Sequence, residues 1–273
     1  MPDQWSVNVC RAMAYLAGPV FGLRKRTVVD QLSAIFQDQS ADDIEKLMKA
    51  VYDHLGRSVS ETFCVSEDAL IKSVAVTPGW GGLDKAVSGG GGAIVVTAHM
   101  GNFELGGRAL AQRYSVLDVI KPMRNPIFGK YLDRERSRHG IATVPMDDSG
   151  RAVLQHLRDG GVVTLLLDQD AGKDGVRIDF LGRPASAWTG AARLALRTGC
   201  PIIPVAIVRN ERSGHTLHIG EAVSVAGLGG SEGDTAELMQ RCSQAVEQFI
   251  YEHPAQWFWV HRRWKGANEA QTV

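Results

Sequence analysis

Hydrophobic positions follow two different patterns along the chain, which divide it near residue 75. Before that point apolar residues recur every three or four positions, as in segments 28–36 and 44–55, and this spacing predicts amphipathic helices. From residue 93 onward, short apolar runs alternate with amphipathic stretches. The runs 93–98, 162–167 and 201–208 are rich in β-branched residues and bounded by glycine or proline, which is typical of strands buried on both faces.

Strands that alternate with helices predict an α/β fold with a mostly parallel central sheet flanked by helices, to which the chain adds an N-terminal helical layer. The expected strands are 93–98, 116–121, 141–144, 162–167, 176–180, 201–208 and 215–219, the last forming a hairpin with its predecessor. The expected helices lie near 102–114, 127–139, 149–158, 189–199 and 233–252. We therefore expect a helical layer at 1–75, an α/β core at 76–265 and a tail at 266–273, joined in one integrated domain.

Several helix starts are marked by residues whose side chains can accept a hydrogen bond from exposed backbone N–H groups. Ser40 precedes one helical pattern and Asn102 another, and either Asp148 or Ser149 precedes a third. We expect these residues to be the N-caps. Asn102 is of particular interest because it starts the helix that follows the first buried strand.

The segment 7–23 is apolar along one side and is followed by three cations, Arg24, Lys25 and Arg26. A cleaved signal peptide carries its charge before the apolar run, so that interpretation is disfavoured. No run reaches the roughly 18 apolar residues of a membrane span. Two interpretations are equally supported: a helix lying in a membrane interface, and an ordinary amphipathic helix packed on the domain.

Composition narrows the classes of function. Lysine plus arginine equals aspartate plus glutamate, 30 of each, so net charge gives no argument for a nucleic-acid partner. The four cysteines are far apart and form no Cys-x-x-Cys pair, which favours a reducing compartment over a disulfide framework or a metal site. The sequence also lacks a Gly-x-Ser-x-Gly elbow and a phosphate-binding loop.

The most informative stretch is His99-Met-Gly-Asn-Phe-Glu104, which joins the first buried strand to its helix. Open α/β sheets place their chemistry in such loops. A neutral histidine can take a proton from a hydroxyl, and a carboxylate bound to its other nitrogen fixes the tautomer. We expect His99 to be the base and Glu104 to orient it, although eight histidines allow chance spacings and a loop histidine can simply bind backbone.

Two further groups of residues stand near strand ends. Asp168-Gln-Asp170 closes the run 162–167; it fails the pattern of a calcium loop because Lys173 occupies the position of the required glycine, which leaves a structural or substrate-orienting role. The cations Lys121, Arg124, Arg134, Arg136 and Arg138 lie between two predicted strands. They fit either a solvated helix face or a site for anions.

Taken in order, these motifs resemble a known family. The His-x4-Glu motif is similar to that of the glycerolipid acyltransferases, and the wider set resembles the bacterial late lipid A biosynthesis acyltransferases, which transfer lauroyl or myristoyl groups. The set comprises 119–126 (VIKPMRNP), 136–140 (RSRHG), 167–170 (LDQD), 180–182 (FLG), Thr189-Gly190, 201–204 (PIIP) and 257–265 (WFWVHRRWK), and the resemblance covers residues 25–265.

The resemblance implies an O-acyltransferase without a cofactor, in which His99 deprotonates an acceptor hydroxyl that attacks an acyl thioester of acyl carrier protein or CoA. It implies a lipid A precursor or related glycolipid as acceptor, no nucleic acid, and a peripheral location at the cytoplasmic face of the bacterial inner membrane. It implies substrate binding by Lys121, Arg124, Asn125, Arg136, Arg138, Asp168, Gln169, Thr189 and Gly190. The alternatives are a lysophospholipid or phosphatidylinositol mannoside acyltransferase and a non-catalytic lipid-binding, membrane-associated protein.

Overall fold

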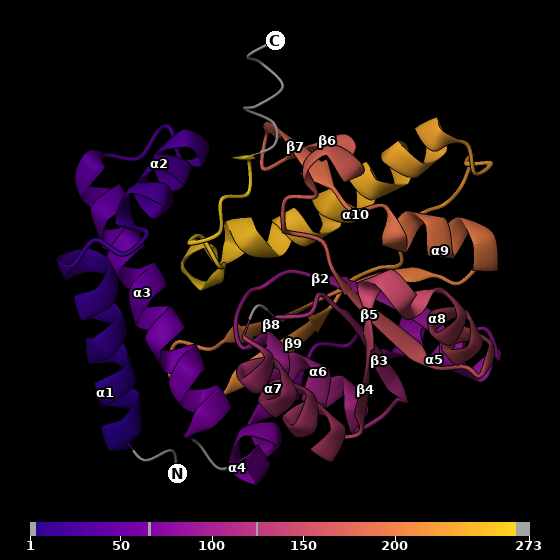
Figure 1. Cartoon of the computed structure of the whole chain (residues 1–273), viewed down its shortest axis with the longest axis horizontal. Coiled ribbons are helices and arrows are strands. Elements are labelled where there is room, and N and C mark those ends of the chain that lie inside the picture. Colours follow the sequence, from indigo (N-terminus) through magenta and orange to yellow (C-terminus); the bar gives the residue numbers. More distant parts are fainter. Residues whose placement is uncertain (1–3, 65–66, 124, 266–273) are drawn as a thin grey trace.

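A computed structural model describes residues 4–64, 67–123 and 125–265 of the chain (Figure 1). Its centre is a seven-stranded sheet with the order β1-β9-β8-β2-β5-β3-β4, and β6 and β7 form a separate hairpin. The strands are β1 (Val74–Val76), β2 (Ala93–Thr97), β3 (Val116–Ile120), β4 (Ile141–Pro145), β5 (Val162–Leu166), β6 (Val176–Phe180), β7 (Arg183–Ala187), β8 (Ile202–Arg209) and β9 (His215–Ile219).

Helices cover both faces of this sheet. They are α1 (Gln4–Tyr15), α2 (Lys25–Ile35), α3 (Ala41–Phe63), α4 (Glu67–Lys72), α5 (Trp80–Ser88), α6 (Phe103–Ala111), α7 (Pro126–Arg138), α8 (Ser149–Arg158), α9 (Gly190–Thr198) and α10 (Glu232–Glu252). A π-helical turn, Leu16–Val20, follows α1, and short 3-10 turns occur at Met146–Asp148, Gly172–Asp174 and Pro254–Gln256. The α/β class, the mostly parallel sheet and the N-terminal helices agree with the sequence prediction.

Strand β2 lies at the middle of the sheet, parallel to β5 on one side and to β8 on the other. Its register with β5 runs from Ala93 opposite Val162 to Thr97 opposite Leu166, so the two strands end level with each other. Alternate residues of β2 enter different cores: Ile94 and Val96 pack toward α10 and the C-terminal tryptophans, while Val95 packs toward α5 and α6. This explains why the strand is apolar throughout.

The predicted hairpin of β8 and β9 is confirmed and is the antiparallel pair of the main sheet. Ser40 and Asn102 cap α3 and α6 as expected, accepting from the N–H groups of Asp43 and Leu105. Asp148, one of the two residues predicted for α8, does occupy its N-cap position, but its side chain makes no cap bond, and the Ser149 hydroxyl donates to the Met146 carbonyl. The Ser149 hydroxyl therefore stabilises the preceding 3-10 turn and does not accept a hydrogen bond from the first N–H groups of α8.

Three elements were not predicted: β1, α5 and β7. Strand β7 contains Pro184 and follows Gly182, residues that indicate a loop on their own. Here they belong to a hairpin, in which Leu181 and Gly182 both have positive φ values, 49° and 72°, as a two-residue type I′ connection requires. Helix α5 begins at Trp80 directly before two glycines, which lower helix propensity.

The N-terminal helices form one side of the molecule, where α1 packs along α3 (Figure 1). Ser6 lies 3.2 Å from Ser60 and Arg11 forms an ion pair with Asp53 at 2.5 Å, so the two helices run antiparallel. The packed-helix interpretation is thus confirmed for one face of α1. The other face of α1 exposes Met13, which is 63% accessible, and Phe21, directly after the π-helical turn, is 79% accessible. Within the described residues, no helix is long and apolar enough to cross a bilayer.

Candidate active site

The level ends of β2 and β5 bring two predicted residues together. His99 follows β2 after one alanine, and Asp168 follows β5 after one leucine, while the Leu167 N–H donates to the Thr97 carbonyl at 3.0 Å. Parallel neighbouring strands therefore present both side chains at the carboxyl edge of the sheet, where open α/β proteins form their sites.

The contact between these two residues is close and multiple. His99 Nδ1 lies 2.7 Å from Asp168 Oδ1, and the His99 backbone N–H donates to Asp168 Oδ2 at 2.9 Å. The indole N–H of Trp257 donates to the same Oδ2 at 2.7 Å. Burial alone would raise the pKa of Asp168, but the interactions with His99 and Trp257 outweigh it and hold the pKa at about 2. The carboxylate is ionised under physiological conditions.

An ionised Asp168 fixes the state of the imidazole. It accepts the proton on Nδ1, so the neutral ring keeps its lone pair on Nε2. The His99 side chain is 23% exposed, and Gln169 Nε2 lies 3.4 Å from His99 Nε2. The rings of Phe103 and Phe258 stand beside the imidazole, with centroids 5.1 and 6.2 Å away. The His99 imidazole is therefore oriented by Asp168 and accessible at Nε2, as a general base must be.

Glu104 makes a different contact from the one predicted. It is buried in the first turn of α6, and its carboxylate accepts two hydrogen bonds from Arg136 of α7, at 2.6 and 3.1 Å. The expectation that Glu104 orients His99 is corrected: Asp168 supplies that carboxylate. The reason is geometric, since the first turn of α6 faces α7 while the end of β5 lies directly beside His99.

A third acidic residue in this area, Asp118 of β3, was not predicted from the sequence. It accepts a hydrogen bond from the Thr164 hydroxyl, and its carboxylate lies 3.9 Å from Arg136. Burial raises the pKa of Asp118 to about 6, against the opposing effects of Thr164 and Arg136. The only sequence signal was an aspartate inside the otherwise apolar strand Val116–Ile120.

His99 opens on a large cleft of about 1090 Å³. Its inner walls are apolar and come from the strands and from α6, α8 and α9, as shown by Val95, Leu110, Val153 and Leu194. Seven predicted residues line this cleft: His99, Glu104, Lys121, Arg136, Gln169, Thr189 and Gly190. The cleft has the size and lining of a site for a long apolar group.

The remaining predicted site residues have other roles or lie elsewhere. Asp168 is buried behind His99. Asn125 caps α7, accepting from the N–H groups of Ile127 and Phe128. Arg138 is bound to Glu135 and largely exposed on the surface of α7, so of these two arginines it is Arg136 that lines the cleft. Arg124 lies outside the described residues.

The loop between His99 and α6 is held from below by the N-terminal layer. His54 Nε2 lies 3.2 Å from the Gly101 carbonyl oxygen, and the Asn102 amide donates to Glu61 at 3.2 Å. Arg209 joins this cluster, donating to Glu61 at 2.5 Å and to His54 Nδ1 at 2.6 Å. Burial, reinforced by the charge of Arg209, lowers the pKa of His54 to about 3, so this histidine is neutral and structural.

Gly101 shows why that loop cannot move freely. Its φ value is +58°, and a Cβ atom there would lie 1.7 Å from the carbonyl oxygen of Ile207. Only glycine fits both the conformation and the space. The position of His99 is thus fixed by the strand before it, the buried cluster below it and the close approach to β8.

These features define a class of protein: an α/β enzyme in which a carboxylate-held histidine stands at the mouth of a deep apolar cleft. Within the described residues, the side chains that contact the His99 imidazole nitrogens are Asp168 and Gln169, and no serine or cysteine side chain hydrogen bonds to His99. Residues 1–266 match the family of bacterial lipid A biosynthesis acyltransferases, and the chain belongs to that family.

Similar proteins are named for two kinds of acyl transfer. A phosphatidylinositol mannoside acyltransferase of Mycobacterium tuberculosis (strain ATCC 25618 / H37Rv) is 27% identical over 81% of this chain and 71% of its own length. The corresponding protein of strain CDC 1551 / Oshkosh is 28% identical over 67% of this chain, and the match spans only 57% of that relative. A lipid A biosynthesis palmitoleoyltransferase of Escherichia coli (strain K12) is 26% identical over 92% of this chain and 81% of its own length.

Proposed function

We propose that this protein transfers a fatty acyl group from an acyl thioester to a hydroxyl of a glycolipid, with His99 as the general base and Asp168 as the residue that orients it. The single observation that carries the proposal is the His99–Asp168 pair at the mouth of the apolar cleft. Membership of the acyltransferase family supports acyl transfer to a glycolipid.

The proposed reaction uses only acid–base chemistry. His99 Nε2 removes the proton from the acceptor hydroxyl as its oxygen bonds to the thioester carbonyl carbon. The resulting tetrahedral species collapses, the carbon–sulfur bond breaks, and the departing thiolate takes the proton from the imidazolium. The products are an ester and the free thiol of the carrier. Asp168 stabilises the imidazolium throughout, and the Gln169 amide, 3.4 Å from Nε2, is placed to contact the reacting oxygens. No cofactor is required.

We assign the apolar cleft to the donor. Its inner walls would hold the acyl chain, and the cations on its lining, Lys121, Lys130 and Arg193, would face the phosphates of acyl carrier protein or CoA. Arg136 has a different role in this proposal. It is already bound to Glu104 and near Asp118, so it fixes α7 against the cleft wall and is not available as a strong anion site.

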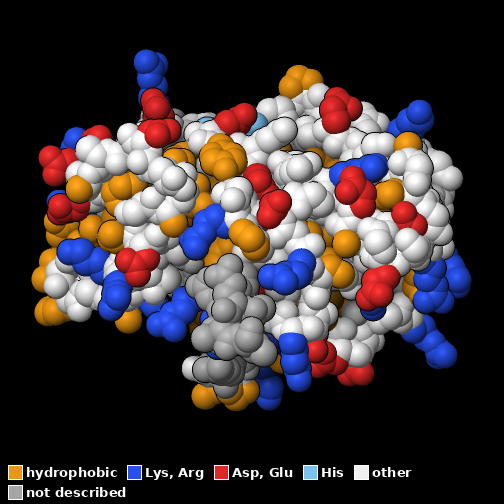
Figure 2. Space-filling view, turned by 90° about the horizontal axis from the view of Figure 1, so that it is seen from above, with side chains coloured by type: hydrophobic (Ala, Val, Ile, Leu, Met, Phe, Trp, Pro, Cys, Tyr) orange, Lys and Arg blue, Asp and Glu red, His pale blue; other side chains and the backbone are white. Residues whose placement is uncertain are grey.

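We also propose a peripheral location at the cytoplasmic face of the bacterial inner membrane. The exposed apolar residues of the N-terminal helices, among them Met13, Val20 and Phe21, are followed by Lys25 and Arg26. Figure 2 shows hydrophobic side chains along the left edge of the molecule, over these helices, with Lys and Arg side chains close by. Apolar residues beside cations favour binding to an anionic lipid surface.

Two acceptors are candidates, a lipid A precursor and a phosphatidylinositol mannoside, because relatives named for each of these activities match the chain at similar identity. A lysophospholipid is the third candidate acceptor. A non-catalytic lipid-binding protein would have no need for the oriented base.

Purified protein tests the proposal directly. Labelled acyl chains supplied on acyl carrier protein and on CoA should appear as ester in glycolipid acceptors, and His99→Ala should reduce the rate by at least about 10²–10³-fold. Circular dichroism and the melting temperature check that the variant is folded. Substantial transfer by folded His99→Ala would eliminate His99 as the base.

A further inference from the structure

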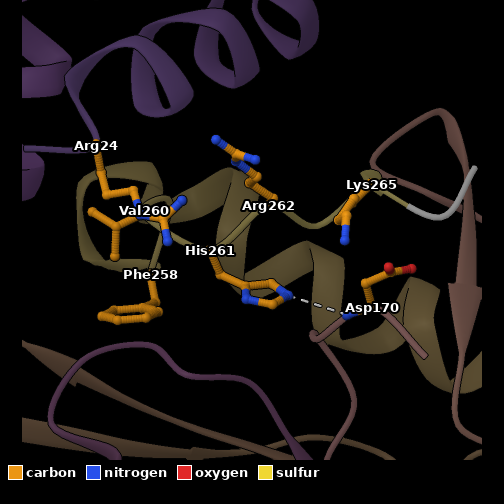
Figure 3. Close-up of a pocket in the computed structure, with 7 residues that line it drawn as sticks. All are labelled: Arg24, Asp170, Phe258, Val260, His261, Arg262 and Lys265. Carbon is orange, nitrogen blue, oxygen red and sulfur yellow. Dashed lines mark hydrogen bonds between the residues drawn. The ribbon is translucent and has the colours of Figure 1, made fainter. Parts of the chain in front are cut away.

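A second cavity, of about 530 Å³, is lined mainly by residues of the C-terminal segment (Figure 3). It is built by three parts of the chain that are distant in sequence: the residue before α2, the residues after β5 and the last described segment. Its lining residues are Arg24, Asp170, Phe258, Val260, His261, Arg262 and Lys265.

The charge of this cavity is positive. Arg24, Arg262 and Lys265 supply three cations against the one carboxylate of Asp170, which leaves a net charge of two. His261 adds a neutral donor: its Nε2 accepts the backbone N–H of Asp170 at 3.3 Å, so its proton is on Nδ1. Burial lowers the pKa of His261, which keeps the ring neutral. Guanidinium, ammonium and imidazole N–H groups together are donors suited to phosphate oxygens.

Buried contacts hold the segment that carries Arg262. The Gln31 side chain donates to the carbonyls of Trp259 and His261, at 2.7 and 2.9 Å, and accepts from the Arg263 N–H at 3.0 Å. The fully buried Arg263 donates to the Ser186 carbonyl at 2.6 Å. The backbone on this wall is therefore fixed before any ligand arrives, which lowers the entropy cost of binding.

Arg24 reaches the cavity from a strained backbone. Its φ is +59°, in the left-handed region that residues other than glycine seldom adopt. Glycine would satisfy this conformation more easily, and such strain is concentrated at functional sites. An arginine kept in this unfavourable conformation is consistent with a role for its positive charge in the cavity.

The cavity and the base share a wall. Phe258 lines the cavity, its N–H donates to the His99 carbonyl at 3.0 Å, and its ring stands 6.2 Å from the imidazole. Gln169, which lies between Asp168 and Asp170, lines the apolar cleft instead. A molecule held in the cavity thus sits next to His99 without occupying the donor cleft.

We propose that this cavity binds a phosphate group on the head group of the acceptor glycolipid and so places the acceptor hydroxyl at His99. The inference rests on the proposed function, because it takes the large cleft as the donor site. It adds a requirement: the acceptor carries a phosphate ester near the sugar that is acylated.

Binding measured without turnover tests this inference. The full chain is titrated by calorimetry with dihexanoyl phosphatidylinositol, dihexanoylglycerol galactoside as a neutral counterpart, inorganic phosphate, and an acyl-CoA. The variants are Arg24→Gly, which suits the left-handed backbone, Arg262→Gln, and the two combined. Arg212→Gln in the exposed β8–β9 loop removes the same charge at a distance and is the control.

Each substitution in the cavity should weaken binding of the phospholipid about tenfold, and the pair about a hundredfold, as expected for lost charge-assisted hydrogen bonds. Arg212→Gln should bind like the wild type, and galactoside and acyl-CoA affinities should be unchanged in all variants. Equal phospholipid binding by all variants would overturn the inference. A selective loss of acyl-CoA binding would also overturn it, and so would inorganic phosphate that binds the wild type as tightly as the phospholipid does. If acyl transfer fails while these binding results hold, the fault lies with the proposed function and not with the phosphate site.

Discussion

The structure makes a sharp distinction between two carboxylates that the sequence alone did not separate. Asp168 Oδ2 accepts two hydrogen bonds, from the His99 backbone N–H and from the Trp257 indole, while Oδ1 faces His99 Nδ1. In Asp168→Asn the oxygen must stay at the Oδ2 position to satisfy both donors. The amide NH2 then faces Nδ1, which forces the proton onto Nε2 and removes the base.

The size of the effect follows from these contacts. Reversing the amide would set its NH2 group against two N–H donors and forfeit two buried hydrogen bonds, at about 2–3 kcal/mol. Roughly one molecule in a hundred would then keep the productive tautomer. Loss of the negative charge beside Nδ1 also removes the stabilisation of the imidazolium and so adds to this penalty. We therefore expect kcat to fall by ~10³–10⁴-fold, as in histidine–aspartate triads.

Glu104→Gln is the matched comparison. It keeps one acceptor oxygen for Arg136 and leaves the Asp168–His99 contact untouched, so kcat should fall by less than about tenfold. Steady-state rates at saturating donor and acceptor, with melting temperatures for both variants, measure the difference. A loss for Glu104→Gln equal to or larger than that for Asp168→Asn would refute the assignment of Asp168 as the orienting residue.

Three further predictions follow from other parts of the molecule. Asp118 has a pKa raised from 3.8 to about 6, so its protonated form adds stability below pH 4 that is lost as pH rises through 6. Asp118→Asn should therefore raise the free energy of unfolding at pH 8 by about 1–2 kcal/mol and make that free energy less dependent on pH in denaturant titrations. An unchanged pH profile would contradict the raised pKa of Asp118. Arg209→Gln should cost about 3 kcal/mol of stability and reduce activity together, because it removes the guanidinium that pairs with the mostly buried Glu61 below the His99 loop. A cost under 1 kcal/mol in urea unfolding would argue against this role. The double variant Met13→Glu/Phe21→Glu should co-sediment with anionic vesicles at least tenfold more weakly than the wild type, whereas Phe258→Leu should not. Equal sedimentation of the wild type and both variants would rule out the N-terminal face as the membrane contact.

Much of the fold could be predicted because local patterns agree with it. The runs at 93–98, 162–167 and 201–208 are apolar because helices cover both faces of the sheet, and their composition and boundaries identify them as strands. Elements whose local signals conflict with the fold were missed. Strand β7 contains a proline and forms because it pairs with β6. Helix α5 has glycines directly after Trp80 and is stabilised by packing of residues such as Leu83 against the sheet.

The candidate site was predicted in part for a similar reason. His99 and Asp168 could each be identified as the end of an apolar strand. Their contact depends on β2 and β5 being neighbours with level ends, across 69 residues of sequence, and no local spacing contains that information. Glu104 was chosen because it is five residues from His99, whereas its real partner, Arg136, lies on α7. The Arg209 cluster and the cationic cavity are likewise formed by segments that lie far apart in the sequence.

Mass spectrometry of lipids from cells with the wild-type protein, without it, and with His99→Ala tests the central claim most directly. The account predicts a glycolipid that is one fatty acyl group heavier in the wild type alone, with the unacylated acceptor accumulating in the other two. Identical glycolipid profiles in all three cell lines, with the wild-type and His99→Ala proteins each shown to be present and folded, would contradict acyl transfer by His99.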